Sequence, residues 1–164
     1  MRIVLLSLAL LGASLVAHAQ DKQNVVTVLN EGVSVLTLKV SGKAEVTPRK
    51  DKTVIHTTDM YLYLWTVGSV SNVTDGLKHV ADVIKGEVLN FKPTTTTELT
   101  IGGGVAKLQT GPSTEADDGD AGSAEVATFE VGKRVFIACI HGEGKIDPKE
   151  HEAMLAVLQT ATAP

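Results

Sequence analysis

The sequence contains one cysteine, Cys139, and few aromatic residues, which make up 4% of the chain. A single cysteine cannot form an internal disulfide, so the fold must depend on its hydrophobic core. Proteins that bind nucleic acid usually carry a basic patch and aromatic side chains that stack on bases. This chain has no basic stripe and a formal net charge of −4, so we expect no nucleic-acid partner.

The common catalytic motifs are also missing. There is no Gly-x-Ser-x-Gly nucleophile elbow, no His-Glu-x-x-His zinc motif, no phosphate loop and no dinucleotide fingerprint. The triplet Gly102-Gly103-Gly104 lacks the Lys-Ser/Thr pair that completes a phosphate loop, so it indicates a hairpin turn instead. These absences argue against the best-known classes of hydrolase, kinase and dehydrogenase.

The chain has one long hydrophobic run, at residues 3–16, after the positive start Met1-Arg2. Ala17-His18-Ala19 then supplies the small-x-small pattern of a signal-peptidase site. We therefore predict a signal peptide at residues 1–19 and export to the periplasm or the extracellular space. The run is too short for a good transmembrane anchor, so we expect no membrane insertion. Residues 20–164 are long enough for a single soluble domain with a proper core.

Apolar runs and turn residues predict a chain rich in strands. The expected strands are 25–29, 33–40, 53–67, 94–97, 99–102, 105–109, 125–131 and 134–140. The strongest is 53–67, whose two faces are both apolar, so it should be covered on both sides. Residues 41–52 and 111–123 are polar, and we expect them to be loops, the first with an exposed strand as the alternative.

Two helices are indicated. The first has an apolar stripe from Val73 to Leu89 at spacings of three and four, with Asn72 or Thr74 as its cap. The second starts at Asp147, followed by Pro148 at the first helical position and Glu150 at the third. Hairpins imply an antiparallel sheet, so the predicted fold class is α+β: an antiparallel sheet flanked by helices in a single-domain sandwich.

The order of these elements resembles the PsbP-like superfamily, which includes extrinsic photosystem proteins and their Ran-binding relatives. The resemblance rests on the strand Tyr61-Leu-Tyr-Leu-Trp65, the helix 73–89, the segment Leu99-Thr-Ile-Gly-Gly-Gly-Val-Ala106, the hairpin 129–135 and the C-terminal helix. It covers roughly residues 25 to 160. Because members of that fold are mostly binding or assembly factors, the resemblance implies a binding role, and it implies no particular site residue.

The segment 115–120 holds four carboxylates in six residues: Glu115, Asp117, Asp118 and Asp120. Several oxygen ligands around a glycine suit Ca²⁺, although the spacing is not that of an EF-hand. The first alternative is a solvated acidic loop. The second is a turn in which Asp117 or Asp120 caps the backbone.

His141 and Glu143 stand two residues apart at the end of a strand, so their side chains should share a face. They form a candidate functional surface, either as metal ligands or as a base with its orienting acid. Zinc would need two further ligands. The candidates are His56, His79 and His151, which no spacing brings together, although His151 is near enough in sequence to share the surface. The alternative is a simple turn at the strand end.

A second candidate surface is the aromatic row Tyr61, Tyr63 and Trp65 on one face of the strongest strand. Such a row is usually core beneath a helix, and it becomes a ligand platform where no helix covers it. A two-residue turn at Gly132-Lys133, of type II′, would place Glu125 opposite Ile140. The acidic segment and His141 would then lie at one edge of the domain.

Three functions remain open. The first is an exported, non-enzymatic binding or accessory module for an unknown protein or small ligand, with no cofactor. The second is a metal-dependent or acid/base enzyme that uses His141 and Glu143 with the acidic loop 115–120. The third is a structural domain stabilised by Ca²⁺.

Overall fold

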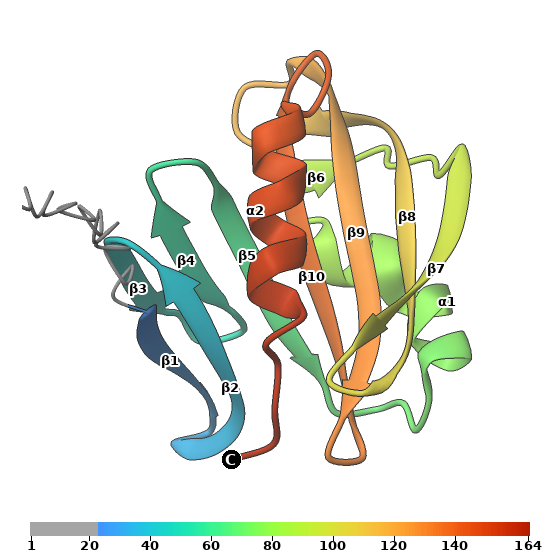
Figure 1. The fold of residues 1–164 in the computed structure, drawn as a ribbon. Coiled ribbons are helices and arrows are strands. Elements are labelled where there is room, and N and C mark those ends of the chain that lie inside the picture. Colours follow the sequence, from blue (N-terminus) through green and yellow to red (C-terminus); the bar gives the residue numbers. More distant parts are fainter. Residues whose placement is uncertain (1–22) are drawn as a thin grey trace, which may run out of the picture.

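Antiparallel strands dominate the computed structural model, which describes residues 23–164 (Figure 1). Strands hold 54% of these residues and helices 16%. The predicted signal peptide, residues 1–19, lies outside the described residues. Between residues 23 and 164, no helix has both the length and the apolar composition needed to cross a membrane.

The elements follow one another in two groups of strands, each ending in a helix. They are β1 (Gln23–Asn30), β2 (Val33–Ser41), β3 (Ala44–Pro48), β4 (Thr53–Thr57), β5 (Tyr61–Val67), α1 (Val73–Ile84), β6 (Val88–Leu89), β7 (Thr95–Ile101), β8 (Gly104–Glu115), β9 (Ala121–Val131), β10 (Arg134–Glu143) and α2 (Pro148–Leu158).

Eight of these strands form one curled sheet, and β1 pairs with β2 in a separate hairpin. The order across the large sheet is β3-β4-β5-β10-β9-β8-β6, with β7 also paired to β8. All of its strand pairs are antiparallel. Its central strands β8, β9 and β10 have ten to twelve residues each, and strands of this length accumulate the twist that curls a sheet.

The two faces of the large sheet carry different cores. On one face, α2 and the β1–β2 hairpin cover a core that includes the stacked rings of Phe129 and Phe136. On the other face, α1 places Val80 and Ile84 against Trp65. We call this second side the α1 face. The helix contacts β9, β10 and β6 there, and β3 and β4 lie further along the sheet (Figure 1).

The predicted fold class, a helix-flanked α+β sandwich, is wrong. The protein is mostly antiparallel sheet, curled into a half-barrel, and a β-hairpin shares with α2 the covering of one face. One source of the error is the segment 111–123, which was predicted to be a loop, whereas β8 and β9 occupy most of it. At Gly111, within β8, the backbone of Lys92 passes so close that a Cβ atom would lie 2.1 Å from its carbonyl oxygen. Only glycine fits at this position, so here glycine is part of a strand and does not end it.

Two further element boundaries differ from prediction. The expected strand 53–67 is split into β4 and β5 by a turn, in which the Thr57 hydroxyl accepts hydrogen bonds from the backbone N–H groups of Asp59 and Met60. The first helix ends at Ile84 and not near Leu89, because Val88 and Leu89 pair with β8 as the short strand β6. Tertiary pairing satisfies the backbone there better than another helical turn would.

The local signals at the helix starts are confirmed. Asn72 caps α1 by accepting a hydrogen bond from the backbone N–H of Asp75. Asp147 and Glu150 form a full capping box at the start of α2, with Pro148 in the first turn. The turn between β9 and β10 also lies where it was predicted, at Gly132-Lys133, but both residues have positive φ, which makes it type I′ and not II′.

Candidate functional site

A row of aromatic and charged side chains crosses the part of the α1 face that α1 leaves uncovered. Its members come from five strands that the sheet brings together. They are Glu45 on β3, His56 on β4, Tyr61 and Tyr63 on β5, His141 on β10 and Glu115 at the end of β8. We call this row the His–Tyr strip.

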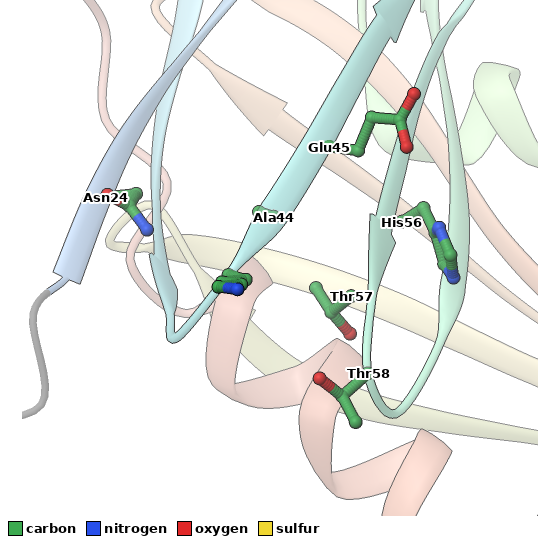
Figure 2. Close-up of a pocket in the computed structure, with 7 residues that line it drawn as sticks. Asn24, Ala44, Glu45, His56, Thr57 and Thr58 are labelled. Carbon is green, nitrogen blue, oxygen red and sulfur yellow. The ribbon is translucent and has the colours of Figure 1, made fainter.

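The strand register explains why the first half of the strip shares a face. Glu45 pairs with His56, and His56 pairs with Tyr61, so the three side chains stand side by side across β3, β4 and β5. The rings of His56 and Tyr61 are stacked, with centroids 3.9 Å apart and an interplanar angle of 9°. Figure 2 shows Glu45 on β3 beside His56 on β4, with Thr57 and Thr58 at the end of β4 that leads into the turn to β5.

A second stack forms the other half. Tyr63 follows Tyr61 on the same face of β5, and its ring lies 5.3 Å from that of His141. The Glu115 carboxylate lies 3.6 Å from Nδ1 of His141. Both ring nitrogens of His141 are buried, and neither has a hydrogen-bond partner among the described residues. Because both nitrogens are buried, they lie beneath the surface of the strip and do not face solvent.

A buried ion pair borders the strip on the side of α1. The Lys52 ammonium lies 2.6 Å from the Glu87 carboxylate, and both side chains are largely buried. Lys52 also lies over the ring of Trp65, 5.7 Å from its centroid, and Arg49 approaches the same carboxylate at 3.9 Å. Burial of the Tyr63 hydroxyl, and then the negative charge of Glu87 beside it, raise the pKa of Tyr63 to about 12. Tyr63 is therefore a neutral hydroxyl throughout the physiological range.

Exposure changes along the aromatic row of β5. Trp65 is 4% exposed and belongs to the core beneath α1, as the sequence predicted for the row. Tyr63 is half-buried, and Tyr61 is 52% exposed. The row is thus core at one end and open platform at the other, because α1 covers only part of the face.

A cavity of about 580 Å³ opens beside the exposed end of the strip. Glu45 and His56 line it together with Lys43, Thr57, Thr58 and, from β1, Asn24 (Figure 2). The strip therefore has one concave end, where a ligand would gain more contact than on a flat sheet surface.

The acidic segment is a short turn, and its carboxylates serve that turn. Only residues 116–120 lie between β8 and β9. Asp117 accepts a hydrogen bond from the N–H of Asp118, and Asp118 accepts one from the N–H of Asp120. Oxygens of Glu115, Asp117 and Asp118 lie within 4.8 Å of one another, and Asp120 is not part of that group. The geometry matches the turn alternative, in which aspartates hold the backbone.

Among the described residues, His141 lies within ion-pair distance of Glu115 and of no other carboxylate. Glu143 is exposed where β10 ends, paired in register with Gly122, and the carboxylate that lies beside His141 is Glu115. His151 lies on α2, over the opposite face of the sheet, where its Nδ1 is 2.6 Å from Glu125. The predicted register is confirmed, since Glu125 pairs with Ile140, and it brings the acidic turn to His141.

Sequence reasoning did not identify the other half of the site. Glu45 was not singled out, and His56 and Tyr61 are register partners across the β4–β5 turn, which the sequence analysis did not recognise. Lys52 and Glu87 lay at the ends of an expected loop and an expected helix, and no spacing links them. Cys139 is fully buried, and this burial raises the pKa of its thiol far above the usual value.

No protein-family model matches this chain, and no curated protein sequence is significantly similar to it. The resemblance to the PsbP-like superfamily therefore remains a prediction.

Proposed function

We propose that the protein is a small, non-enzymatic binding module that holds its ligand or partner against the His–Tyr strip. Residues 1–19 predict that it works after export, in the periplasm or outside the cell. The observation that carries the proposal is the pair of stacks, His56 on Tyr61 and Tyr63 on His141, on the part of the sheet that α1 does not cover.

The exposure of Tyr61 supports this proposal. Burying an aromatic ring provides much of the free energy of binding at protein interfaces, and Tyr is enriched among the residues that dominate it. Tyr61 is 52% exposed, although two strands away the same face is a closed core. Its stack with His56 also fixes the ring, so little side-chain entropy is left to lose on binding.

The polar groups of the strip also favour binding over catalysis. The Tyr63 hydroxyl stays protonated, and the Lys52 ammonium that borders the strip is held by Glu87, so neither is a ready base or nucleophile. His141 is enclosed between Tyr63 and Glu115. These groups can donate or accept hydrogen bonds, which provides specificity without bond-making chemistry.

A fluorescence titration tests the proposal, because Trp65 is the sole tryptophan and its ring lies 6.1 Å from that of Tyr63. The probes are capped hexapeptides of basic, acidic and uncharged composition and simple oligosaccharides. At least one probe should change the Trp65 emission saturably. That response should weaken at least roughly tenfold in Tyr61→Ala, the loss typical of a dominant interface residue.

Leu29→Ala is the matched control, since Leu29 is an equally exposed apolar side chain on β1, outside the strip. It should leave the titration unchanged. The proposal fails if no probe saturates, or if every saturable response survives both Tyr61→Ala and His56→Ala.

A further inference from the structure

The His–Tyr strip carries acidic side chains at both ends. Glu45 is exposed at the β3 end. At the other end, Glu115 lies beside His141. Asp117 and Asp118 are exposed, and each has a carboxylate oxygen within 4.8 Å of one of Glu115. Aromatic rings lie between the two acidic ends. The strip therefore combines negative charge with π faces over one continuous surface.

The nearby basic side chains neutralise little of this charge. Lys52 and Arg49 both approach Glu87, at 2.6 and 3.9 Å, so their charge is directed to that carboxylate. Lys43 lines the cavity beside Glu45. It is the one lysine or arginine among the residues that line this cavity. At the other end, residues 115–120 include a further acidic residue, Asp120, and no lysine or arginine.

Resting on the function proposed above, we propose that the occupant of the strip is a basic peptide segment of a partner protein. Arginine and lysine side chains are attracted to the faces of tyrosine rings and to carboxylates, so both features of the strip favour the same ligand charge. The acidic turn, which the fold does not need for its core, would raise the rate of encounter with such a segment.

The dimensions fit an extended segment. Adjacent strands lie about 4.8 Å apart, so the path from Glu45 on β3 to Glu115 on β8, five strand spacings, is roughly 24 Å, or about seven extended residues. A basic residue at each end of such a segment would reach Glu45 and the acidic turn while its middle crosses Tyr61 and Tyr63.

The test is a titration with three capped hexapeptides in which serine alternates with arginine, with glutamate or with glutamine. The arginine peptide should bind most tightly, and its affinity should fall steeply as salt is raised. The variants Glu45→Gln and Asp117→Asn/Asp118→Asn should each weaken it by roughly tenfold, since each removes charge that faces the peptide.

The control is Glu98→Gln, which removes an exposed acid on β7, away from the strip. It should leave the affinity unchanged. The glutamine peptide could bind as tightly as the arginine peptide, with this binding lost in Tyr61→Ala. The strip would then be a binding surface whose occupant is not basic, and this inference would be wrong. If arginine-peptide binding persists in both acidic-strip variants, the inference is also overturned. If no peptide binds, this inference fails, whereas the proposed function still stands if an oligosaccharide probe saturates and that response weakens in Tyr61→Ala.

Discussion

The ring of Tyr63 on β5 stacks on the ring of His141 at the end of β10, with centroids 5.3 Å apart. This contact joins two parts of the α1 face that have different surroundings. On one side, Tyr63 lies next to Tyr61, whose ring stacks on that of His56. On the other side, His141 lies beside Glu115, the residue that precedes the acidic turn. One pair of residues thus makes a continuous surface from features that are far apart in sequence.

The first prediction concerns tyrosine ionisation. The chain has two tyrosines, so Tyr61→Phe leaves Tyr63 as the only one. Because the pKa of Tyr63 is raised from 10.0 to about 12, the absorbance change of tyrosinate in the folded variant should be centred near pH 12. A transition centred near pH 10 in the folded variant would contradict the burial of this hydroxyl beside Glu87.

The same shift predicts a loss of stability at high pH. Between pH 10 and 12 the unfolded state loses the tyrosine proton and the folded state keeps it, so the free energy of unfolding should fall as pH rises through this window. Below pH 10 both states are protonated and the contribution is complete. Denaturant titrations of Tyr63→Phe should show a weaker pH dependence than the wild type, with Tyr61→Phe as the control.

The second prediction concerns the buried ion pair. Lys52→Met leaves the largely buried Glu87 without its closest partner and should lower the free energy of unfolding by roughly 3 kcal/mol. Lys52→Met/Glu87→Leu removes both charges and should be less destabilised than the sum of the single variants. Lys78→Met, in the exposed pair with Asp75 on α1, should cause no measurable change. Additive single effects at Lys52 and Glu87 would show that the pair is not coupled.

The third prediction concerns the contact between α1 and the sheet. A Cβ atom at Gly76 would lie 2.8 Å from Thr128 and 2.9 Å from Val135. Gly76→Ala should therefore destabilise the protein by about 1 kcal/mol, because the overpacking outweighs the gain in helix propensity. Thermal unfolding measures this effect. Gly68→Ala, where nothing lies within 4 Å, is the matched control, and a stabilised Gly76→Ala would show that α1 sits further from the sheet.

The fourth prediction concerns Cys139. Its side chain is fully buried and burial raises the pKa of the thiol, so a thiol reagent at pH 8 should not label the folded protein within minutes. One equivalent should react once denaturant is added. Rapid labelling of the native protein would place this residue outside the core of the α1 face.

Sequence reasoning succeeded where structure is decided locally. The caps at Asn72 and Asp147 and the turn at Gly132-Lys133 depend on neighbouring residues, and the turn then fixes the register from Glu125 to Ile140. That register was enough to bring the acidic turn close to His141. The side-chain partner of His141 was not predictable in the same way, because Glu115 reaches it across β9 from the end of β8.

The rest of the site depends on contacts between distant segments. Residues 111–123 look like a loop because glycine and proline usually interrupt strands, yet tight passage of the chain at Gly111 makes glycine necessary within β8. The helix α1 packs mainly on β9, β10 and β6 and leaves Tyr61 exposed, and it ends early because β6 pairs with β8. Neither effect produces a periodic pattern of residues from which it could be predicted.

Chemical-shift mapping of the wild-type protein, titrated with the arginine hexapeptide, tests the central claim most directly. We expect the largest backbone shifts at the His–Tyr strip, above all at Glu45, His56 and Tyr61, with little change on α2. The largest shifts on α2 or on the β1–β2 hairpin, or no shifts at all, would contradict the claim that this strip is the binding surface.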